Sequence, residues 1–175
     1  MKFYIKNTNT NEILELEATS YGALSKNFRQ APYELASDEE VKIKQLQAAK
    51  EDKINQIKAQ RNANLLKPTP QTVTYEGNLA NKSFNINVKE HLPIFNSIIT
   101  ILQSKVDAGA VNPTRTWTDS SGEVLELSLS DYISLANHLD FRDSQEYAMC
   151  SRRIKALDGL TLEEVENFDI TAIYE

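Results

Sequence analysis

The stretch 37–66 constrains the fold most, because it contains neither glycine nor proline and has clear start and stop signals. Ser37 and Glu40 form a capping box, and the acidic residues between them suit the positive end of a helix dipole. Pro68 and Pro70 follow at the other end, where the fixed backbone of proline and its missing N–H group stop a helix. The sequence therefore predicts one helix over this stretch, about 40 Å long.

The apolar side chains of this predicted helix form a narrow stripe, which Lys50 and Arg61 interrupt where further core residues would be expected. So narrow a stripe suits contact with one other element better than a deep core. Two interpretations remain open: a bridging helix that lies on its own domain, or a coiled-coil-like helix that self-associates or docks onto a partner. The stripe consists of Ile43, Leu46, Ile54, Ile57 and Leu65.

The rest of the sequence predicts an α+β fold, with short β-hairpins and amphipathic helices in two small lobes joined by the long helix. Alternating apolar runs on both sides of turn-forming residues predict hairpins over about 2–17, 72–88 and 115–127. The segment KPTPQ is expected to be a linker, because its two prolines favour extended chain. The expected domains are an N-terminal hairpin lobe (1–36), the connecting helix (37–67) and a C-terminal α+β domain (70–175).

Three more helices are expected in the C-terminal domain. Pro93 starts or kinks the first of them, which carries a continuous apolar face. Ser128 or Ser130 caps the second, and Thr161 with Glu164 makes a capping box that opens a short third helix.

Trp117 is the only tryptophan of the chain and lies in the first strand of the third predicted hairpin. We expect it to fill the corner between that hairpin and the helices, where such a side chain buries about 150–250 Å². The alternative is an exposed tryptophan that binds a partner.

Composition argues against several functional classes. A net charge of −6 disfavours nucleic acid as a partner, since phosphate contacts need a concentrated basic surface. The one cysteine, Cys150, and the two histidines, His91 and His138, lack the spacing of a zinc site, and the scattered glycines form no phosphate loop. We expect no enzymatic activity, catalytic residue, cofactor or metal. No apolar stretch reads as a membrane span or a secretion signal.

The region from about Asn55 to Ile173 resembles a domain of unknown function that recurs in phage and prophage tail proteins, commonly near tail-fibre genes. The resemblance is carried by INQIKAQRNANL, the hairpin TVTYEGN to KSFNINV, IFNSIITILQ, the block TWTDSSGEVLELSLSDYISLANHL, RRIKAL and the tail LDGLTLEEVENFDITAIY. It implies a phage-tail setting and no enzymatic activity.

We therefore expect a tail-fibre accessory protein, either a fibre-assembly chaperone or a cap that binds the fibre tip, working in the bacterial cytoplasm during assembly. The alternative is a structural tail, baseplate or fibre subunit of the virion, close to the receptor. The expected partner is a tail-fibre or baseplate protein, with a homo-oligomer through the helix over 38–66 as a further alternative, and neither nucleic acid nor membrane is expected. The candidate contact residues are Ile43, Leu46, Ile54, Ile57, Trp117, Ile173 and Tyr174.

Overall fold

A single helix, α1 (Asp38–Leu66), occupies the stretch between the capping box and the prolines, as the sequence predicts. The Ser37 hydroxyl accepts a hydrogen bond from the Glu40 backbone N–H at 3.2 Å, and the Glu40 carboxylate accepts one from the Ser37 N–H at 2.9 Å. The two ends of the capping box thus satisfy backbone donors that the first helical turn leaves unpaired.

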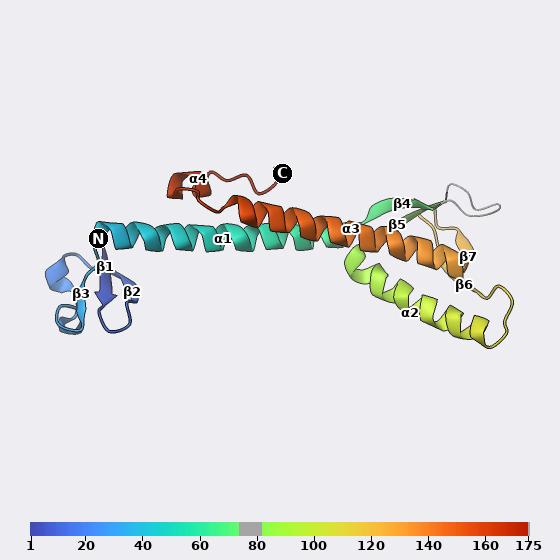
Figure 1. Cartoon of the computed structure of the whole chain (residues 1–175), viewed down its shortest axis with the longest axis horizontal. Coiled ribbons are helices and arrows are strands. Elements are labelled where there is room, and N and C mark those ends of the chain that lie inside the picture. Colours follow the sequence, from blue (N-terminus) through green and yellow to red (C-terminus); the bar gives the residue numbers. More distant parts are fainter. Residues whose placement is uncertain (74–81, 175) are drawn as a thin grey trace. The chain divides into compact units, whose positions relative to one another are not determined.

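The computed structural model of the chain describes residues 1–73 and 82–174 (Figure 1). The α+β fold expected from the sequence is confirmed. The chain divides into two compact units, and the division falls within α1. Unit 1 comprises Met1–Asn55 and Leu157–Ile170, and unit 2 comprises Gln56–Ala156 and Thr171–Glu175.

The sheet of unit 1 has three antiparallel strands, with β1 (Lys2–Asn7) between β2 (Ile13–Glu17) and β3 (Tyr33–Leu35). Strands β1 and β2 form the predicted first hairpin, and β3 pairs with the other edge of β1. Ile5 in the central strand is fully buried. Two short 3-10 helices, Tyr21–Ala23 and Lys26–Phe28, connect β2 to β3.

Helix α4 (Leu162–Glu166) belongs to the same unit and starts at the predicted capping box of Thr161 and Glu164. Val165 and Phe168 are buried, and the Lys53 ammonium donates a hydrogen bond of 3.3 Å to the backbone carbonyl of Phe168. The segment around α4 is therefore fixed to α1 within unit 1.

Unit 2 is built on two long helices, α2 (Val88–Asp107) and α3 (Leu129–Ala156), which lie side by side (Figure 1). Two two-stranded sheets pack against α3, the first of β4 (Thr69–Val73) with β5 (Lys82–Ile86) and the second of β6 (Thr114–Thr118) with β7 (Val124–Ser128). The core of the unit is formed by the end of α1 and by β5, α2, β7 and α3, and Trp117 of β6 packs against it. Its fully buried side chains are Leu65, Phe84, Phe95, Leu127, Tyr132, Leu135 and Leu139.

The predicted third hairpin is confirmed as β6 and β7, and Gly122 in its turn has the positive φ of 88° that favours glycine. Ser128 caps α3, since its hydroxyl accepts from the Asp131 N–H and the Asp131 carboxylate accepts from the Ser128 N–H. The second predicted hairpin is described only in part: β4 and β5 pair antiparallel over 69–73 and 82–86, and residues 74–81 lie outside the described residues.

Of the two roles expected for Pro93, that of starting the helix was wrong, because α2 begins five residues earlier, at Val88, and Pro93 lies inside it. The Asn87 side chain caps the helix by accepting the Glu90 N–H at 2.8 Å and donating to the Glu90 carboxylate at 2.8 Å. His91 Nδ1 accepts the Asn87 N–H at 3.1 Å. A helix with its first turn fixed in this way tolerates the single hydrogen bond that proline removes in the second turn.

The linker expected at KPTPQ was also wrong in part, because Pro70 lies in β4 opposite Asn85. Among the described residues β4 pairs only with β5, so its other edge needs no donor from proline. Tyr147 of α3 is 46% exposed and packs under Arg61, whose guanidinium carbon lies 4.2 Å from the ring centre. That cation–π contact explains a cation at a position of α1 where the spacing predicts an apolar residue.

Candidate functional site

An apolar hollow lies between α1 and α4 in unit 1 and holds about 320 Å³; we call it the α1–α4 hollow. Ile43 and Leu46 come from the predicted stripe, and Leu162 comes from the first turn of α4. Ile43 is 49% exposed although it is a large aliphatic side chain. Glu39 and Lys42 complete the lining and give the hollow one charge of each sign.

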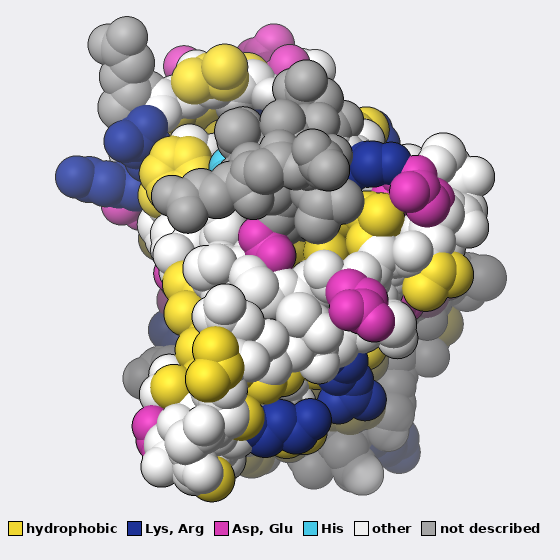
Figure 2. Space-filling view, turned by 90° about the vertical axis from the view of Figure 1, so that its right-hand side faces the viewer, with side chains coloured by type: hydrophobic (Ala, Val, Ile, Leu, Met, Phe, Trp, Pro, Cys, Tyr) yellow, Lys and Arg dark blue, Asp and Glu magenta, His cyan; other side chains and the backbone are white. Residues whose placement is uncertain are grey.

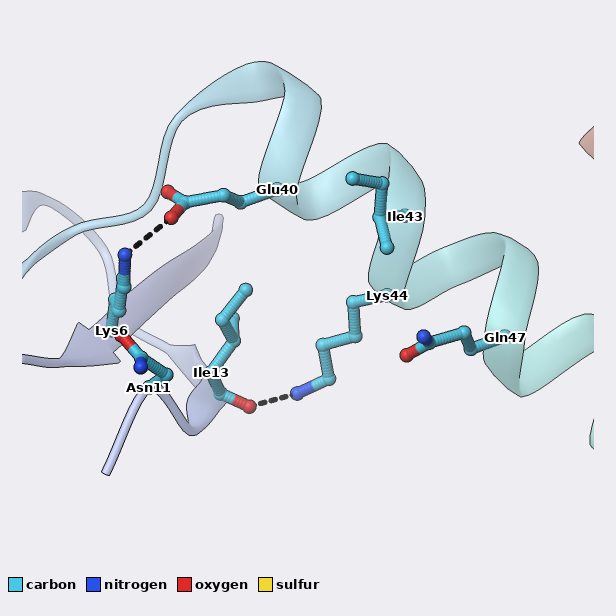
Figure 3. Close-up of a pocket in the computed structure, with 7 residues that line it drawn as sticks. All are labelled: Lys6, Asn11, Ile13, Glu40, Ile43, Lys44 and Gln47. Carbon is cyan, nitrogen blue, oxygen red and sulfur yellow. Dashed lines mark hydrogen bonds and ion pairs between the residues drawn. The ribbon is translucent and has the colours of Figure 1, made fainter.

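A second cavity, the hairpin pocket, lies between the first hairpin and α1 and holds about 410 Å³ (Figure 3). Lys6 and Glu40 form an ion pair at 2.5 Å on one side of it, and the Lys44 ammonium donates to the backbone carbonyl of Ile13 on the other. Both lysines therefore have protein partners. Ile43 lines this pocket as well as the α1–α4 hollow, so it separates two concave surfaces. The complete lining is Lys6, Asn11, Ile13, Glu40, Ile43, Lys44 and Gln47.

Hydrogen bonds from the Lys6 side chain and from the backbone and hydroxyl of Ser37 lower the pKa of Glu40 to about 2. The carboxylate therefore stays ionised in the folded protein well below its ordinary range. Its ion pair with Lys6 joins β1 to the first turn of α1, and both side chains line the hairpin pocket.

The other candidate residues of the stripe lie in different surroundings. Ile54 is half-buried, and Ile57 is fully buried and forms part of no surface. Leu65, the last stripe residue, belongs to the core of unit 2. Of the stripe, Ile43 and Leu46 are therefore the side chains that reach a concave surface.

Trp117 is half-buried against the core of unit 2 and makes three aromatic contacts. Its ring centre lies 5.0 Å from that of Phe95, 6.0 Å from that of His91 and 6.4 Å from that of Tyr132, all in edge-on geometry. Such contacts add to the burial of each ring. Trp117 thus packs in the corner between β6 and the helices, while part of its ring is accessible.

The C-terminal candidates Ile173 and Tyr174 follow a segment that Arg153 holds. Arg153 is buried, with its Nε atom donating to the carbonyl of Ala172 and its Nη2 atom to the carbonyl of Thr171, both at 3.0 Å. Beyond this anchor Ile173 is 81% exposed, and Tyr174 is half-buried.

Figure 2 shows one face of unit 2, on which hydrophobic side chains lie in several separate groups among polar and charged ones. Within residues 1–73 and 82–174, no group of three or more His, Cys, Asp and Glu side chains is placed to hold a metal ion. Cys150 is a buried free thiol. In the same part of the chain, no helix combines the length and the apolar character that a membrane span needs.

Sequence reasoning did not single out Leu162 or Arg153. Leu162 directly follows the capping residue Thr161, and an aliphatic side chain at the first position of a helix is a weak signal. Arg153 had no signal at all, because its two acceptors are backbone carbonyls nearly twenty residues away.

Comparison of the chain with protein-family models, with curated proteins and with solved structures found no match.

Proposed function

We propose that this chain is a phage or prophage tail-fibre accessory protein that acts through protein–protein contacts, as a fibre-assembly chaperone or a cap on the fibre tip. The resemblance of residues from about 55 to 173 to a tail-protein domain supports the phage-tail setting. In this setting the protein works in the bacterial cytoplasm while fibres assemble.

The α1–α4 hollow is the main structural support for a function through protein–protein contacts. Ile43, Leu46 and Leu162 line a concave apolar surface, and Ile43 remains 49% exposed in it. Burial of apolar area is the main favourable term in protein association, and a concave apolar surface with a charged rim is suited to it. Fibre subunits expose strand edges and apolar side chains before they trimerise, so a protein that covers these groups suppresses aggregation.

Co-expression tests the proposal directly. The chain is produced together with the tail-fibre protein encoded nearest to it in its own genome, and the soluble, trimeric fibre is measured by gel filtration. We expect more soluble fibre with the chain than without it, and little gain with the variant Ile43→Lys, which places a charge in the hollow. Val111→Lys is the matched control, because Val111 is 90% exposed, lines neither cavity of unit 1 and is not a candidate contact residue.

Equal fibre solubility with and without the chain would overturn the chaperone function. Mass spectrometry of purified particles distinguishes a chaperone from a structural subunit of the virion. A structural subunit is present at a fixed copy number per particle, whereas a chaperone is absent or sub-stoichiometric. Light scattering of the isolated chain tests the homo-oligomer, which requires a mass of at least two chains.

A further inference from the structure

Strand β6 has one paired edge and one free edge. It pairs with β7 from Thr114 to Thr118, and no other strand pairs with it in the described part of the chain. The Asp119 N–H donates to the Glu123 carbonyl at 2.9 Å, so these two opposite residues form a hydrogen-bonded pair. Hydrogen-bonded and non-hydrogen-bonded pairs alternate along an antiparallel ladder. Arg115 and Trp117 therefore direct their backbone groups to β7, while Thr114, Thr116 and Thr118 direct theirs to the other edge. The Thr116 carbonyl also accepts a long hydrogen bond of 3.4 Å from the Tyr132 hydroxyl, so the Thr116 N–H is the main group that this position offers to a further strand.

A hollow of about 490 Å³, which we call the β6 groove, lies between β6 and α2. One wall is Arg115, Thr116 and Trp117 of β6, and no residue of β7 lines the groove. The other wall belongs to α2. It consists of Pro93, Ile94, Ser97 and Ile98.

The groove is apolar around Trp117 and positively charged around Arg115. Trp117 is half-buried, and Ile94 across the groove is 44% exposed, so both keep apolar surface available. Arg115 is exposed, and among the described residues its side chain makes no ion pair. Alternation along the strand places Arg115 on the same face as Trp117, two residues away.

We propose that the β6 groove binds an extended peptide segment of another protein by strand addition, and that the segment carries an apolar and an acidic side chain at alternate positions. Backbone hydrogen bonds to the free edge at Thr116 hold the segment as a third strand. Its apolar side chain packs between Trp117 and Ile94, and its carboxylate pairs with Arg115. The groove belongs to unit 2 and the α1–α4 hollow to unit 1, and the inference does not rest on the tail-fibre proposal.

The charge of Arg115 decides the kind of occupant. A carboxylate next to a guanidinium forms charge-assisted hydrogen bonds, which are about twice as strong as neutral ones. A second copy of β6 would instead bring another Arg115 to the same small sheet, where like charges repel. The geometry thus favours an acidic and apolar segment over self-association through this edge.

The probe is a synthetic peptide with the core Thr-Val-Thr-Asp-Thr, long enough to pair with the five residues of β6. Its valine and aspartate lie on one face, matching Trp117 and Arg115. Trp117 is the only tryptophan of the chain, so its fluorescence reports directly on occupancy of the groove. We expect saturable binding with a blue shift, and binding at least about tenfold weaker when lysine replaces the aspartate of the peptide.

A variant of the full chain tests the ion pair between Arg115 and the carboxylate of the peptide. Arg115→Glu should invert the preference, so that the lysine peptide binds more tightly than the aspartate peptide. Arg152→Glu is the matched control, because it makes the same charge change at an exposed position near the C-terminal end of α3. It should leave the preference unchanged.

Thr116→Pro removes one donor from the free edge and leaves the bonds to β7 intact, since proline is tolerated on edge strands. It should abolish binding of the aspartate peptide while circular dichroism shows an unchanged helix content. Absence of any fluorescence change up to millimolar peptide would overturn the proposal. So would equal binding of both peptides to the unmodified chain, or occupancy of the edge only by a second copy of the chain, seen as a concentration-dependent mass.

Discussion

The Nζ atom of Lys6 lies 2.5 Å from Oε1 of Glu40, and this ion pair joins the central strand of unit 1 to the first turn of α1. The other carboxylate oxygen of Glu40 accepts hydrogen bonds from the backbone and the hydroxyl of Ser37, both at 2.9 Å. One side chain therefore serves the helix cap and the contact between sheet and helix. The ion pair requires the ionised form of the carboxyl group, and ionisation also strengthens the hydrogen bonds that the carboxyl group accepts from Ser37.

Unit 1 should lose stability in acid because of Glu40. Its pKa falls from an ordinary value of 4.5 to about 2 on folding, so its contribution is complete above pH 4.5 and is lost as the pH falls from 4.5 towards 2. Glu40→Gln should lower the melting temperature at neutral pH and flatten its dependence on pH in this window. Glu39→Gln is the control, since Glu39 makes neither contact. Parallel pH profiles of the Glu40→Gln variant and the unmodified chain would contradict this.

Unit 2 should lose stability at high pH as the hydroxyl group of Tyr132 ionises. Burial raises its pKa from 10.0 to about 12, because the ionised phenolate is poorly solvated in the core. The neutral form is favoured in the folded state, so its contribution is complete below pH 10 and is lost as the pH rises from 10 to 12. In an alkaline titration followed by tyrosinate absorbance, Tyr132→Phe should remove the latest step. An unchanged late step would assign it to another tyrosine.

Arg153→Met should release the C-terminal segment. The arginine donates to the carbonyls of Ala172 and Thr171, and hydrogen bonds from a charged group contribute about 1.5–3 kcal/mol each. We expect lower stability in urea denaturation and faster chymotryptic cleavage at Tyr174. Arg152→Met, at the exposed neighbouring position, should behave like the unmodified chain. If both variants are cleaved at the same rate, Arg153 does not hold the segment.

Phe95→Ala should disrupt the aromatic contacts around Trp117. Phe95 is fully buried and contacts both Trp117 and Tyr132, so its removal leaves a cavity that costs about 3–5 kcal/mol. The fluorescence of Trp117 should shift to the red as water reaches the ring. Ile94→Ala, one residue earlier at a 44% exposed position, should cost much less. Similar losses in the two variants would show that Phe95 is not the centre of this packing.

Local signals predicted helix starts and turns well. The capping boxes of α1 and α4 and the turn at Gly122 involve residues at most a few positions apart, so short segments of sequence contain all the interacting groups. Asn87 with Glu90 is the same kind of signal. Sequence reasoning missed it because the alternating run before it extended the predicted strand to Val88.

The candidate site could be predicted only in part. Ile43 and Leu46 were expected on an apolar stripe, and they do line the α1–α4 hollow. The remaining lining depends on Leu162, which is more than a hundred residues further along the chain. The free edge of β6 was equally hidden, because an alternating run predicts a strand but does not say on which side it is paired.

Helix caps, proline positions and residue alternation act between near neighbours along the chain, and most of the helices and strands could therefore be predicted from them. Which apolar residues are buried depends on how these elements pack. Ile43 and Ile57 lie on the same predicted stripe, yet Ile43 is 49% exposed and Ile57 is fully buried. The physical reason is that burial requires a second surface, and that surface comes from distant parts of the chain, whose positions no local pattern encodes.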